Sequence, residues 1–253
     1  TRFANLLGEG TISAGEQLSL FEKEPMKLGF PSEYEIEVSI VDDEKKLNAL
    51  VEKIKERKKI SFDTETTSTD PMAAALVGIS LAVEEGAAFY IPVGHKGGAK
   101  QLPITTVITA LEDVFTNRAI KKIGHNLKYD CLILRNYGLN PFPLSFDTMV
   151  AAWVIEPESH RLGLKTMAEV ELGVKMTHIE ELIGSGKSQI TMDAVAVEDV
   201  APYAGADAEI PLRLEKILSE RLLENQLDKV FDEIEMPLVP VLEDMEFTGI
   251  GVD

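Results

Sequence analysis

The order of strand-like and helix-like segments predicts an α/β fold, in which a mixed β-sheet is flanked by α-helices. Three strand-like runs follow one another closely, over 60–64, 76–83 and 87–93. After them, helical patterns alternate with short strand-like runs. Strands in direct succession, followed by strands separated by helices, make a mixed sheet with helices packed against it.

The segment before these runs predicts one strand and one helix. Apolar residues alternate over 34–41, as on a strand with one buried face, and recur at helical spacing over 44–56. Asp42 or Asp43 can cap this helix, since a carboxylate there accepts bonds from free backbone N–H groups. A short hairpin connection, Glu84-Glu85-Gly86, joins the second and third of the three strands.

The later segments predict helices interrupted by short strands. The expected helices are 103–117, 126–137, 147–154, 164–172, 179–183, 197–225 and 226–249, and the expected strands are 122–125 and 144–146. Gly138 ends the second of these helices, and Asp147 caps the third. Pro202 fits the first turn of the sixth helix, whereas Pro211 cannot donate to the carbonyl of Asp207 and should kink that helix.

Composition indicates an ordinary soluble globular protein. Of 253 residues, 45% are hydrophobic and 27% are charged, so the chain can bury a full core. The single cysteine, Cys131, excludes an internal disulfide and fits a reducing cytoplasm. The longest apolar stretch, 72–83, is too short to span a bilayer, and no signal peptide opens the chain. We therefore expect a cytoplasmic monomer with no membrane association.

The net charge of −18 argues only superficially against a nucleic-acid partner, because phosphate binding ordinarily uses Lys and Arg. The acidic excess is uneven along the chain. Residues 197–253 hold 15 acidic and 4 basic side chains, whereas residues 95–135 hold 7 basic and 3 acidic ones. Local charge therefore matters more than net charge in deciding the partner.

Asp63 and Glu65 are the first candidates for a functional site. They lie two residues apart at the end of the first central strand, so their carboxylates share one face of it. Two adjacent anions repel each other unless a cation or a shared proton compensates. The alternative is a strand that simply ends in a polar turn, where acidic residues are common.

Three further candidates lie on later helices. Asp130 is on the helix after the fourth central strand, and Tyr203 and Asp207 are four apart on the long helix, which puts them on one helical face. Each one alone is an ordinary surface acid or a core aromatic residue. Together, four carboxylates and a tyrosine suit phosphodiester hydrolysis with two hard divalent cations, Mg²⁺ or Mn²⁺.

In their order, these motifs resemble the proofreading 3′-5′ exonuclease domain of bacterial DNA polymerase I, in the DEDD exonucleases with an RNase H-like fold. The matching segments are Asp63-Thr64-Glu65-Thr66, Asn126 to Asp130, Phe146-Asp147-Thr148-Met149, Tyr203 to Asp207 and Glu235 to Pro240. The resemblance covers residue 34 to the end. The family has two branches, in which either a tyrosine or a histidine helps to orient the attacking water. The histidine would stand five positions before the last aspartate, where this chain has Pro202, whereas Tyr203 stands four positions before Asp207. The chain therefore resembles the tyrosine branch.

The resemblance implies a role for each matched residue. Asp63, Glu65 and Asp207 would hold one metal ion, and Asp63 and Asp130 the second. Tyr203 and Glu65 would orient the attacking water. The residues that would contact the single-stranded 3′ end of DNA are Asn126, Tyr129 and Arg161. For Arg161 an exposed guanidinium without a role is the alternative.

Two positions depart from the family pattern. Thr69 stands where the family has an aliphatic wedge between the terminal bases, and Ile179 replaces an aromatic residue that stacks on a base. Stacking of one base contributes about 1–3 kcal/mol. We therefore expect weaker binding of single strands, without a necessary effect on catalysis.

The resemblance also predicts a domain order. Residues 1–33, rich in Gly and Pro, would be a linker from a preceding domain, 34–225 the exonuclease domain, and 226–253 the start of a polymerase domain in the same chain. The chain does not begin with Met, which also suggests a fragment. The alternative enzyme is a ribonuclease of the RNase D type, and the alternative without activity is an exonuclease fold kept as a scaffold.

One motif lies inside the predicted linker. Gln17, Leu18, Ser19, Leu20 and Phe21 resemble the pentapeptide by which bacterial replication proteins dock on the sliding clamp. Leu20 and Phe21 would enter an apolar pocket of the clamp, since buried apolar and aromatic groups dominate such contacts. The alternative is that these side chains pack on a neighbouring domain.

Overall fold

A mixed sheet of six strands forms the centre of the computed structural model, which describes residues 34–251. The strands are β1 (Glu37–Ile40), β2 (Lys59–Thr66), β3 (Leu76–Glu84), β4 (Ala87–Pro92), β5 (Lys121–Gly124) and β6 (Phe146–Asp147), in the order β1-β4-β3-β2-β5-β6. Antiparallel pairs join β2 to β3 and β3 to β4. Parallel pairs join β1 to β4, β2 to β5 and β5 to β6. The predicted α/β fold with a mixed sheet is confirmed.

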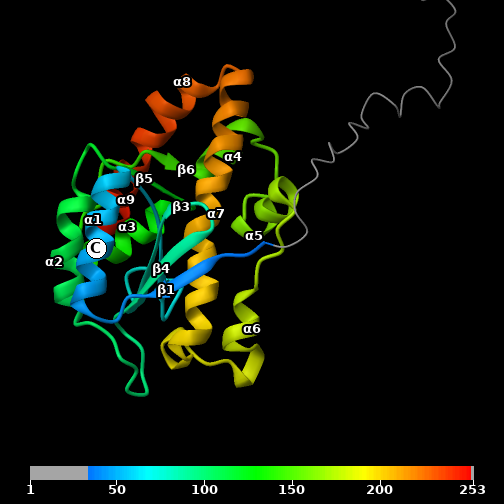
Figure 1. Ribbon diagram of the computed structural model, residues 1–253. Coiled ribbons are helices and arrows are strands. Elements are labelled where there is room, and N and C mark those ends of the chain that lie inside the picture. Colours follow the sequence, from blue (N-terminus) through cyan, green and yellow to red (C-terminus); the bar gives the residue numbers. More distant parts are fainter. Residues whose placement is uncertain (1–33, 252–253) are drawn as a thin grey trace, which may run out of the picture. The chain divides into compact units, whose positions relative to one another are not determined.

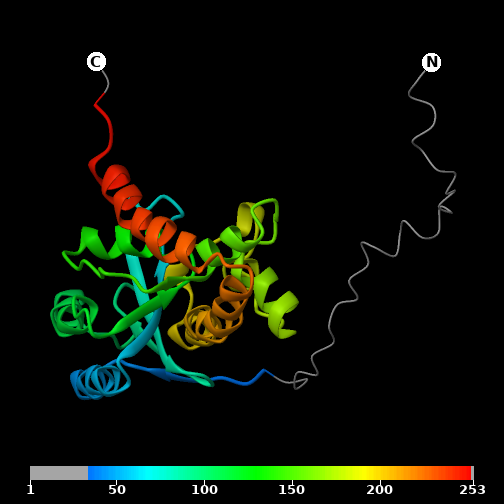
Figure 2. The same ribbon diagram turned by 90° about the horizontal axis from the view of Figure 1, so that it is seen from above.

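Two layers of helices cover the sheet (Figures 1 and 2). On one face, α1 (Glu44–Arg57) and α2 (Ile104–Phe115) share a core with β2, β3 and α3 (Leu127–Asn136). On the other face, α7 (Val197–Glu224) packs across the strands together with α4 (Thr148–Ile155). The shorter helices are α5 (Leu164–Met167), a π-helical turn Ala168–Leu172, α6 (Ile179–Ile183) and 3₁₀ turns at Gly186–Ser188 and Met192–Ala194.

Strand β2 serves both layers because its side chains alternate. Ile60 and Phe62 are fully buried in the core beneath α1 and α2, and the Phe62 ring meets the Phe115 ring edge-on at 5.0 Å. The intervening side chains, including Asp63, point to the opposite face, where α7 lies. The strand is therefore anchored on one side and carries polar groups on the other.

Helix ends differ from the expected bounds by one or two residues, as capping dictates. Asp43, and not Asp42, caps α1 by accepting from the Lys46 N–H at 2.9 Å. Asp147 caps α4 as predicted, by accepting from the N–H groups of Met149 and Val150. Asn126 is the N-cap of α3 in the left-handed region (φ 58°) and not its first helical residue.

Helix α7 runs without interruption through both of its prolines. It begins at Val197, so Pro202 lies beyond the first turn, contrary to the expectation. The helix also continues past Pro211, where a kink is expected, because its buried apolar side packs against the sheet. Packing here outweighs two missing backbone hydrogen bonds.

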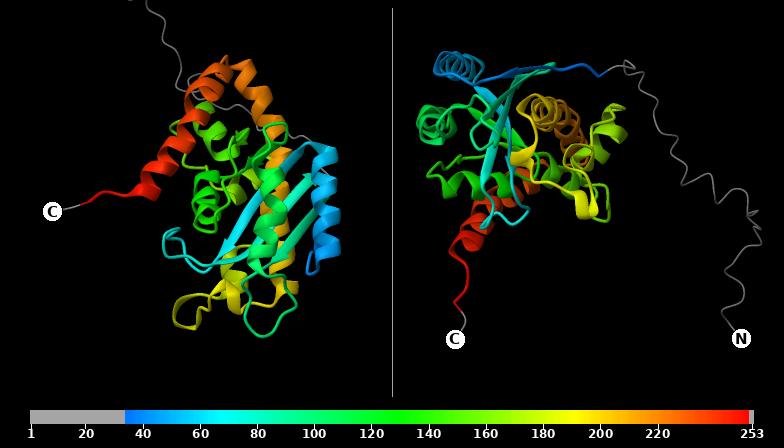
Figure 3. Two further views of the ribbon diagram at one scale, coloured as in Figure 1. Left: turned by 90° about the vertical axis from the view of Figure 1, so that its left-hand side faces the viewer. Right: turned by 90° about the horizontal axis from the view of Figure 1, so that it is seen from below.

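The last helical run packs on α3. It comprises α8 (Asp228–Val230), a π-helical turn Phe231–Glu235 and α9 (Met236–Thr248), and Figures 2 and 3 show α9 beside α3. Arg135 of α3 donates to Glu243 at 2.8 Å and to Asp244 at 2.9 Å, and its guanidinium lies 3.9 Å from the centre of the Phe247 ring. The sequence pattern alone offered this helix no partner. Among the described residues, no helix is both long enough and apolar enough to cross a bilayer.

Gly205 allows α7 to lie close to the sheet. A Cβ atom at this position would come within 2.7 Å of Val38 Cγ2 and 3.3 Å of Ala88 Cβ. The small residue stands between Tyr203 and Asp207, so the same close approach brings both side chains to the sheet.

We predict that Gly205→Ala destabilises the fold by about 1–3 kcal/mol, since extra volume in a packed core forces neighbours to shift. Urea unfolding followed by circular dichroism measures this loss. Combining it with Val38→Ala, which removes the methyl groups that clash, should recover part of the stability. A double variant no more stable than Gly205→Ala would show that the Val38 contact is not the cause.

Candidate active site

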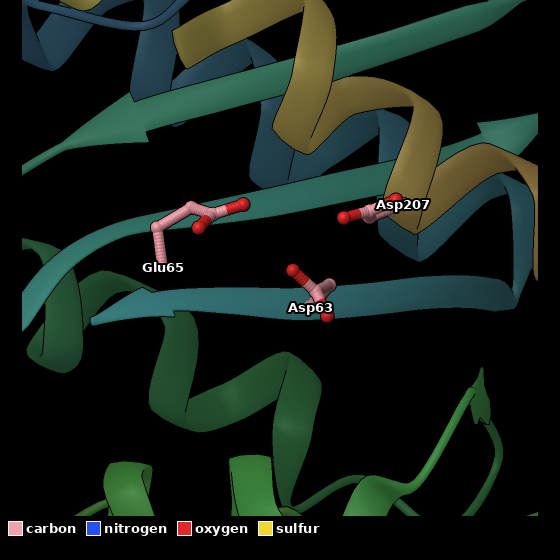
Figure 4. A group of neighbouring side chains, drawn as sticks. All are labelled: Asp63, Glu65 and Asp207. Atoms are coloured by element: carbon pink, nitrogen blue, oxygen red, sulfur yellow. The ribbon is translucent and has the colours of Figure 1, made fainter. Parts of the chain in front are cut away.

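Three carboxylates converge where β2 meets α7. Asp63 and Glu65 project from β2, Asp207 projects from α7, and one oxygen of each lies within 4.8 Å of the others (Figure 4). The spacing of two along the strand puts Asp63 and Glu65 on the same face, as predicted. Helix α7 adds Asp207 from a position 142 residues after Glu65, so only the tertiary structure brings the trio together.

Asp130 approaches the strand from α3. Its Oδ1 accepts from the Thr64 backbone N–H at 2.9 Å and from Thr64 Oγ1 at 2.6 Å. The residue is only 3% exposed, so the interpretation as a solvated helix residue is wrong. Thr64 lies between Asp63 and Glu65, and its two hydrogen bonds therefore fix Asp130 beside the trio.

Asp147 positions the helix that carries Asp130. Its carboxylate accepts from the N–H groups of Asn126 at 3.1 Å and Leu127 at 2.8 Å, in addition to capping α4. One buried side chain thus holds the first turns of two helices. Burial raises the pKa of Asp147, while its hydrogen bonds from backbone N–H groups lower it.

Burial raises the pKa of every carboxyl group of this cluster, and the charges of neighbouring cluster carboxylates raise those of Asp63 and Glu65 further. Burial, followed by the charges of Asp130, Glu65 and Asp207, places the pKa of Asp63 well above its ordinary value. Burial, then the charge of Asp207, raises the pKa of Glu65 to about 8. Burial raises the pKa of Asp130 to about 7 and that of Asp207 to about 6. A cluster with these values holds protons near neutral pH unless cations replace them.

The donor set fits divalent cations such as Mg²⁺ or Mn²⁺. All the converging groups are carboxylate oxygens, which these hard ions prefer. Asp207 Oδ1 is buried and has no hydrogen-bond partner within residues 34–251. Because unpaired buried polar atoms are costly, this oxygen is suited to binding a cation.

The four carboxylates line a cavity of about 970 Å³ together with Tyr203. Tyr203 is half-buried on α7, one turn before Asp207. Burial, followed by the charges of Asp207, Glu65 and Asp63, raises its pKa well above the ordinary value near 10. The phenol therefore stays protonated at any physiological pH.

The predicted substrate contacts are placed unequally. Asn126 and Tyr129 line the cavity, and the Tyr129 hydroxyl lies 2.6 Å from both Ser68 O and Thr66 Oγ1. Thr69 and Ile179, the two departures from the family pattern, also line it. Arg161 is exposed and lies outside the lining, although the nearby segment 163–166 belongs to it.

His125 and Lys165 are among the cavity residues that the sequence did not single out. His125, on the β5–α3 connection, is held by Thr148 Oγ1 2.9 Å from its Nδ1, and burial lowers its pKa to about 4, so it is neutral. Lys165 of α5 extends its ammonium to the Thr177 carbonyl at 2.6 Å. A single lysine in a short helical pattern gives no local sign that it lines a cavity. His125 could have been found from the sequence, because it directly precedes Asn126 in a matched motif.

Comparisons with known proteins agree with this geometry. The family model described as 3′-5′ exonuclease matches residues 38–223. The chain is 42% identical to DNA polymerase I of Chloroflexus aurantiacus over 99% of its own length and 26% of that protein. It is 37% identical to DNA polymerase I of Pseudomonas aeruginosa, over 88% of the chain and 25% of the relative. The chain thus spans about a quarter of the length of these relatives, and the resemblance expected from its motifs is confirmed.

Solved structures share the fold at low sequence identity. NrnC of Brucella melitensis with bound Mg²⁺ aligns with a TM-score of 0.60 and 22% identity, over 76% of this chain and 86% of that one. RNase D of Escherichia coli aligns with a TM-score of 0.60 and 19% identity, over 85% of this chain and 52% of that one. These likenesses support the RNase H-like fold alone.

The raised pKa values predict an unusual dependence of stability on pH in the absence of metal. Unfolded carboxyl groups titrate near pH 4, whereas the folded cluster titrates at about 6 (Asp207), about 7 (Asp130) and about 8 (Glu65). Between these limits the folded state binds more protons, so the free energy of unfolding falls as pH rises. Urea titrations in a chelator, at several pH values between about 5 and 9, measure this slope.

The variant Asp207→Asn provides the control, because it removes one charge from the cluster and leaves the rest of the chain's acidic surface. We expect its stability to decline less steeply with pH than that of the wild type. Saturating Mg²⁺ should flatten the wild-type curve as well. Identical slopes for variant and wild type would show that the cluster does not hold the extra protons.

Proposed function

This chain belongs to the 3′-5′ exonuclease family, and on that premise we propose that it removes nucleotides from the 3′ end of DNA by metal-dependent hydrolysis, releasing 5′-monophosphates. The observation that carries the proposal is the convergence of Asp63, Glu65 and Asp207 within 4.8 Å on the wall of a cavity of about 970 Å³. A cavity of this size can take in a terminal nucleotide while the carboxylates face its phosphodiester.

We assign two divalent ions to this cluster. Asp63, Glu65 and Asp207 would hold one, and Asp63 with Asp130 the second. Bound in pairs, such ions lower the pKa of a water molecule and stabilise charge on the attacking and leaving oxygens. Asp207 Oδ1 has no hydrogen-bond partner among the described residues, which supports the first assignment. Thr64 bonds to Oδ1 of Asp130, so the other carboxylate oxygen of Asp130 can serve the second ion.

The remaining side chains orient the reactants. Tyr203 stays protonated, so its hydroxyl would position the attacking water and would not remove a proton from it. Glu65 would accept a hydrogen bond from the same water. Asn126 and Tyr129 would hold the terminal nucleotide from the α3 side of the cavity, and the contact by Arg161 remains a prediction from sequence.

The cavity lining bears on affinity for the strand. Thr69 and Ile179 offer no ring and only a small aliphatic surface to a base. Loss of one stacking contact costs about 1–3 kcal/mol. We propose that the isolated chain binds single strands weakly and relies on additional contacts outside residues 34–225.

A proofreading role follows from the relatives. The relatives with 42% and 37% identity are DNA polymerases I. We therefore propose that residues 34–225 are the proofreading domain of a family A DNA polymerase and that residues 226–253 lead into its polymerase domain. We also propose that the protein acts as a cytoplasmic monomer. The competing assignment is an RNase D-type ribonuclease, since RNase D shares the fold.

The decisive test is degradation of 3′-labelled and 5′-labelled DNA and RNA primers with Mg²⁺ or Mn²⁺. We expect the wild type to shorten DNA from its 3′ end, and Asp63→Ala or Asp207→Ala to abolish cleavage without loss of folding, because each substitution relieves repulsion in the metal-free cluster. Preference for RNA would favour the ribonuclease. Cleavage by Asp207→Ala near the wild-type rate would remove the site assignment.

The clamp motif lies outside the described residues, and docking on a sliding clamp is a separate proposal. Gln17, Leu18, Leu20 and Phe21 would bind the clamp and so raise the effective concentration of the enzyme at a primer. Titration of the whole chain against the clamp of its own organism should give measurable binding that Leu20→Ala/Phe21→Ala abolishes. Equal affinity of both forms, or no binding at high micromolar clamp, would contradict it.

A further inference from the structure

Lys165 is the one Lys or Arg side chain that lines the cavity within residues 34–251. It belongs to α5, the short helix that contributes Leu164, Lys165 and Thr166 to the cavity lining. The ammonium group is held from two sides. It donates to the Thr177 carbonyl at 2.6 Å, and it lies over the Tyr203 ring at 4.1 Å from the ring centre.

The ring of Tyr203 therefore sits between two supports. It packs against the buried cluster that includes Val200 and Ala204 of its own helix, and Lys165 covers it from α5. A cation this close to an aromatic face is attracted by the negative charge of the π-system. The bond to Thr177 in turn fixes the ammonium, so the ring position depends on a contact that spans three segments of the chain.

The charge of Lys165 also reaches the carboxylates. Lys165 lines the same cavity as Asp63, Glu65 and Asp207, so its positive charge attracts all three carboxylates across that cavity. No other lysine or arginine of the described residues lines the cavity. Within residues 34–251, Lys165 is thus the one Lys or Arg side chain in the cavity that the three carboxylates share.

We propose that Lys165 is a positioning residue of the exonuclease reaction: it holds the Tyr203 ring so that the hydroxyl faces the carboxylates, and it competes electrostatically with metal ions for them. The inference rests on the proposed function. Loss of the Lys165 charge is expected to affect cleavage and metal binding in opposite directions. Removing the charge should slow cleavage, because Tyr203 loses its orientation, and should tighten metal binding, because a competing cation is gone.

The variant Lys165→Met tests both claims, since it keeps the length of the side chain and removes the charge. We expect kcat on single-stranded DNA to fall by about 3- to 30-fold, the size that a cation–π contact supports, with KM changed less than about 3-fold. Lys165→Arg retains the cation over the ring and should restore most of kcat. Lys175→Met is the matched control, because Lys175 is exposed, lies two residues from Thr177 and does not line the cavity.

A double-variant cycle separates positioning from direct contact with the substrate. Tyr203→Phe alone should slow cleavage by about 10- to 1000-fold. If Lys165 acts through the hydroxyl of Tyr203, adding Lys165→Met to Tyr203→Phe should cost less than about 2-fold more. If the two losses multiply, or if KM rises in Lys165→Met, the lysine contacts the strand itself and the proposal is overturned.

Metal binding gives a readout that does not require cleavage. Calorimetric titration with Mn²⁺ in the absence of DNA should show binding about 3- to 10-fold tighter for Lys165→Met than for the wild type, at equal thermal stability of the two proteins. Weaker binding would overturn the proposal, because it would mean that Lys165 holds the carboxylates together. A wild type that cleaves neither DNA nor RNA would remove the proposed function, and the Mn²⁺ comparison would still test the electrostatic claim.

Discussion

Repulsion among four buried carboxylates is the constraint on which the arrangement of this protein depends. Asp63, Glu65, Asp130 and Asp207 come from three different elements, and the pKa of each is raised. Carboxyl groups with these shifts destabilise the folded state at neutral pH. They can be kept together only because strong packing on both sides of the sheet outweighs the cost.

That packing is divided between the two faces of β2. Ile60 and Phe62 are buried beneath α1 and α2, which fixes the strand without using the face that carries Asp63 and Glu65. On the second face, α7 reaches the sheet closely because Gly205 has no side chain in the way. Asp147 holds α3 and α4 by their first turns, and so places Asp130. Each carboxylate is positioned by a buried feature that is not itself part of the site.

One basic side chain, Lys165, lies at the cavity that the four carboxylates line. The chain carries a net charge of −18, yet a lysine stands at the cavity, over the ring of Tyr203. Lys165 therefore places one positive charge among the carboxylates that line the cavity. The hydrogen bond from Lys165 to the Thr177 carbonyl keeps the charge at the cavity. A freely exposed lysine would be screened by solvent and salt.

Local sequence was sufficient for the strand pattern, the fold class and the first carboxylate pair. Alternation of two along β2 places Asp63 and Glu65 on one face whatever surrounds them, and a spacing of four relates Tyr203 to Asp207 on any helix. The sequence also identified the family, because the motifs around Asp63, Asp130 and Asp207 follow one another along the chain in the family's order.

Only the tertiary structure decided the environment of these groups. The burial of Asp130 depends on Thr64, the packing of the last helix depends on Arg135, and the role of Lys165 depends on Tyr203. In each case the partners are 38 or more residues apart. Neither helical nor strand periodicity relates residues so far apart, because both describe neighbours within one element, whereas burial, pKa and ring contacts are set by whichever element packs opposite.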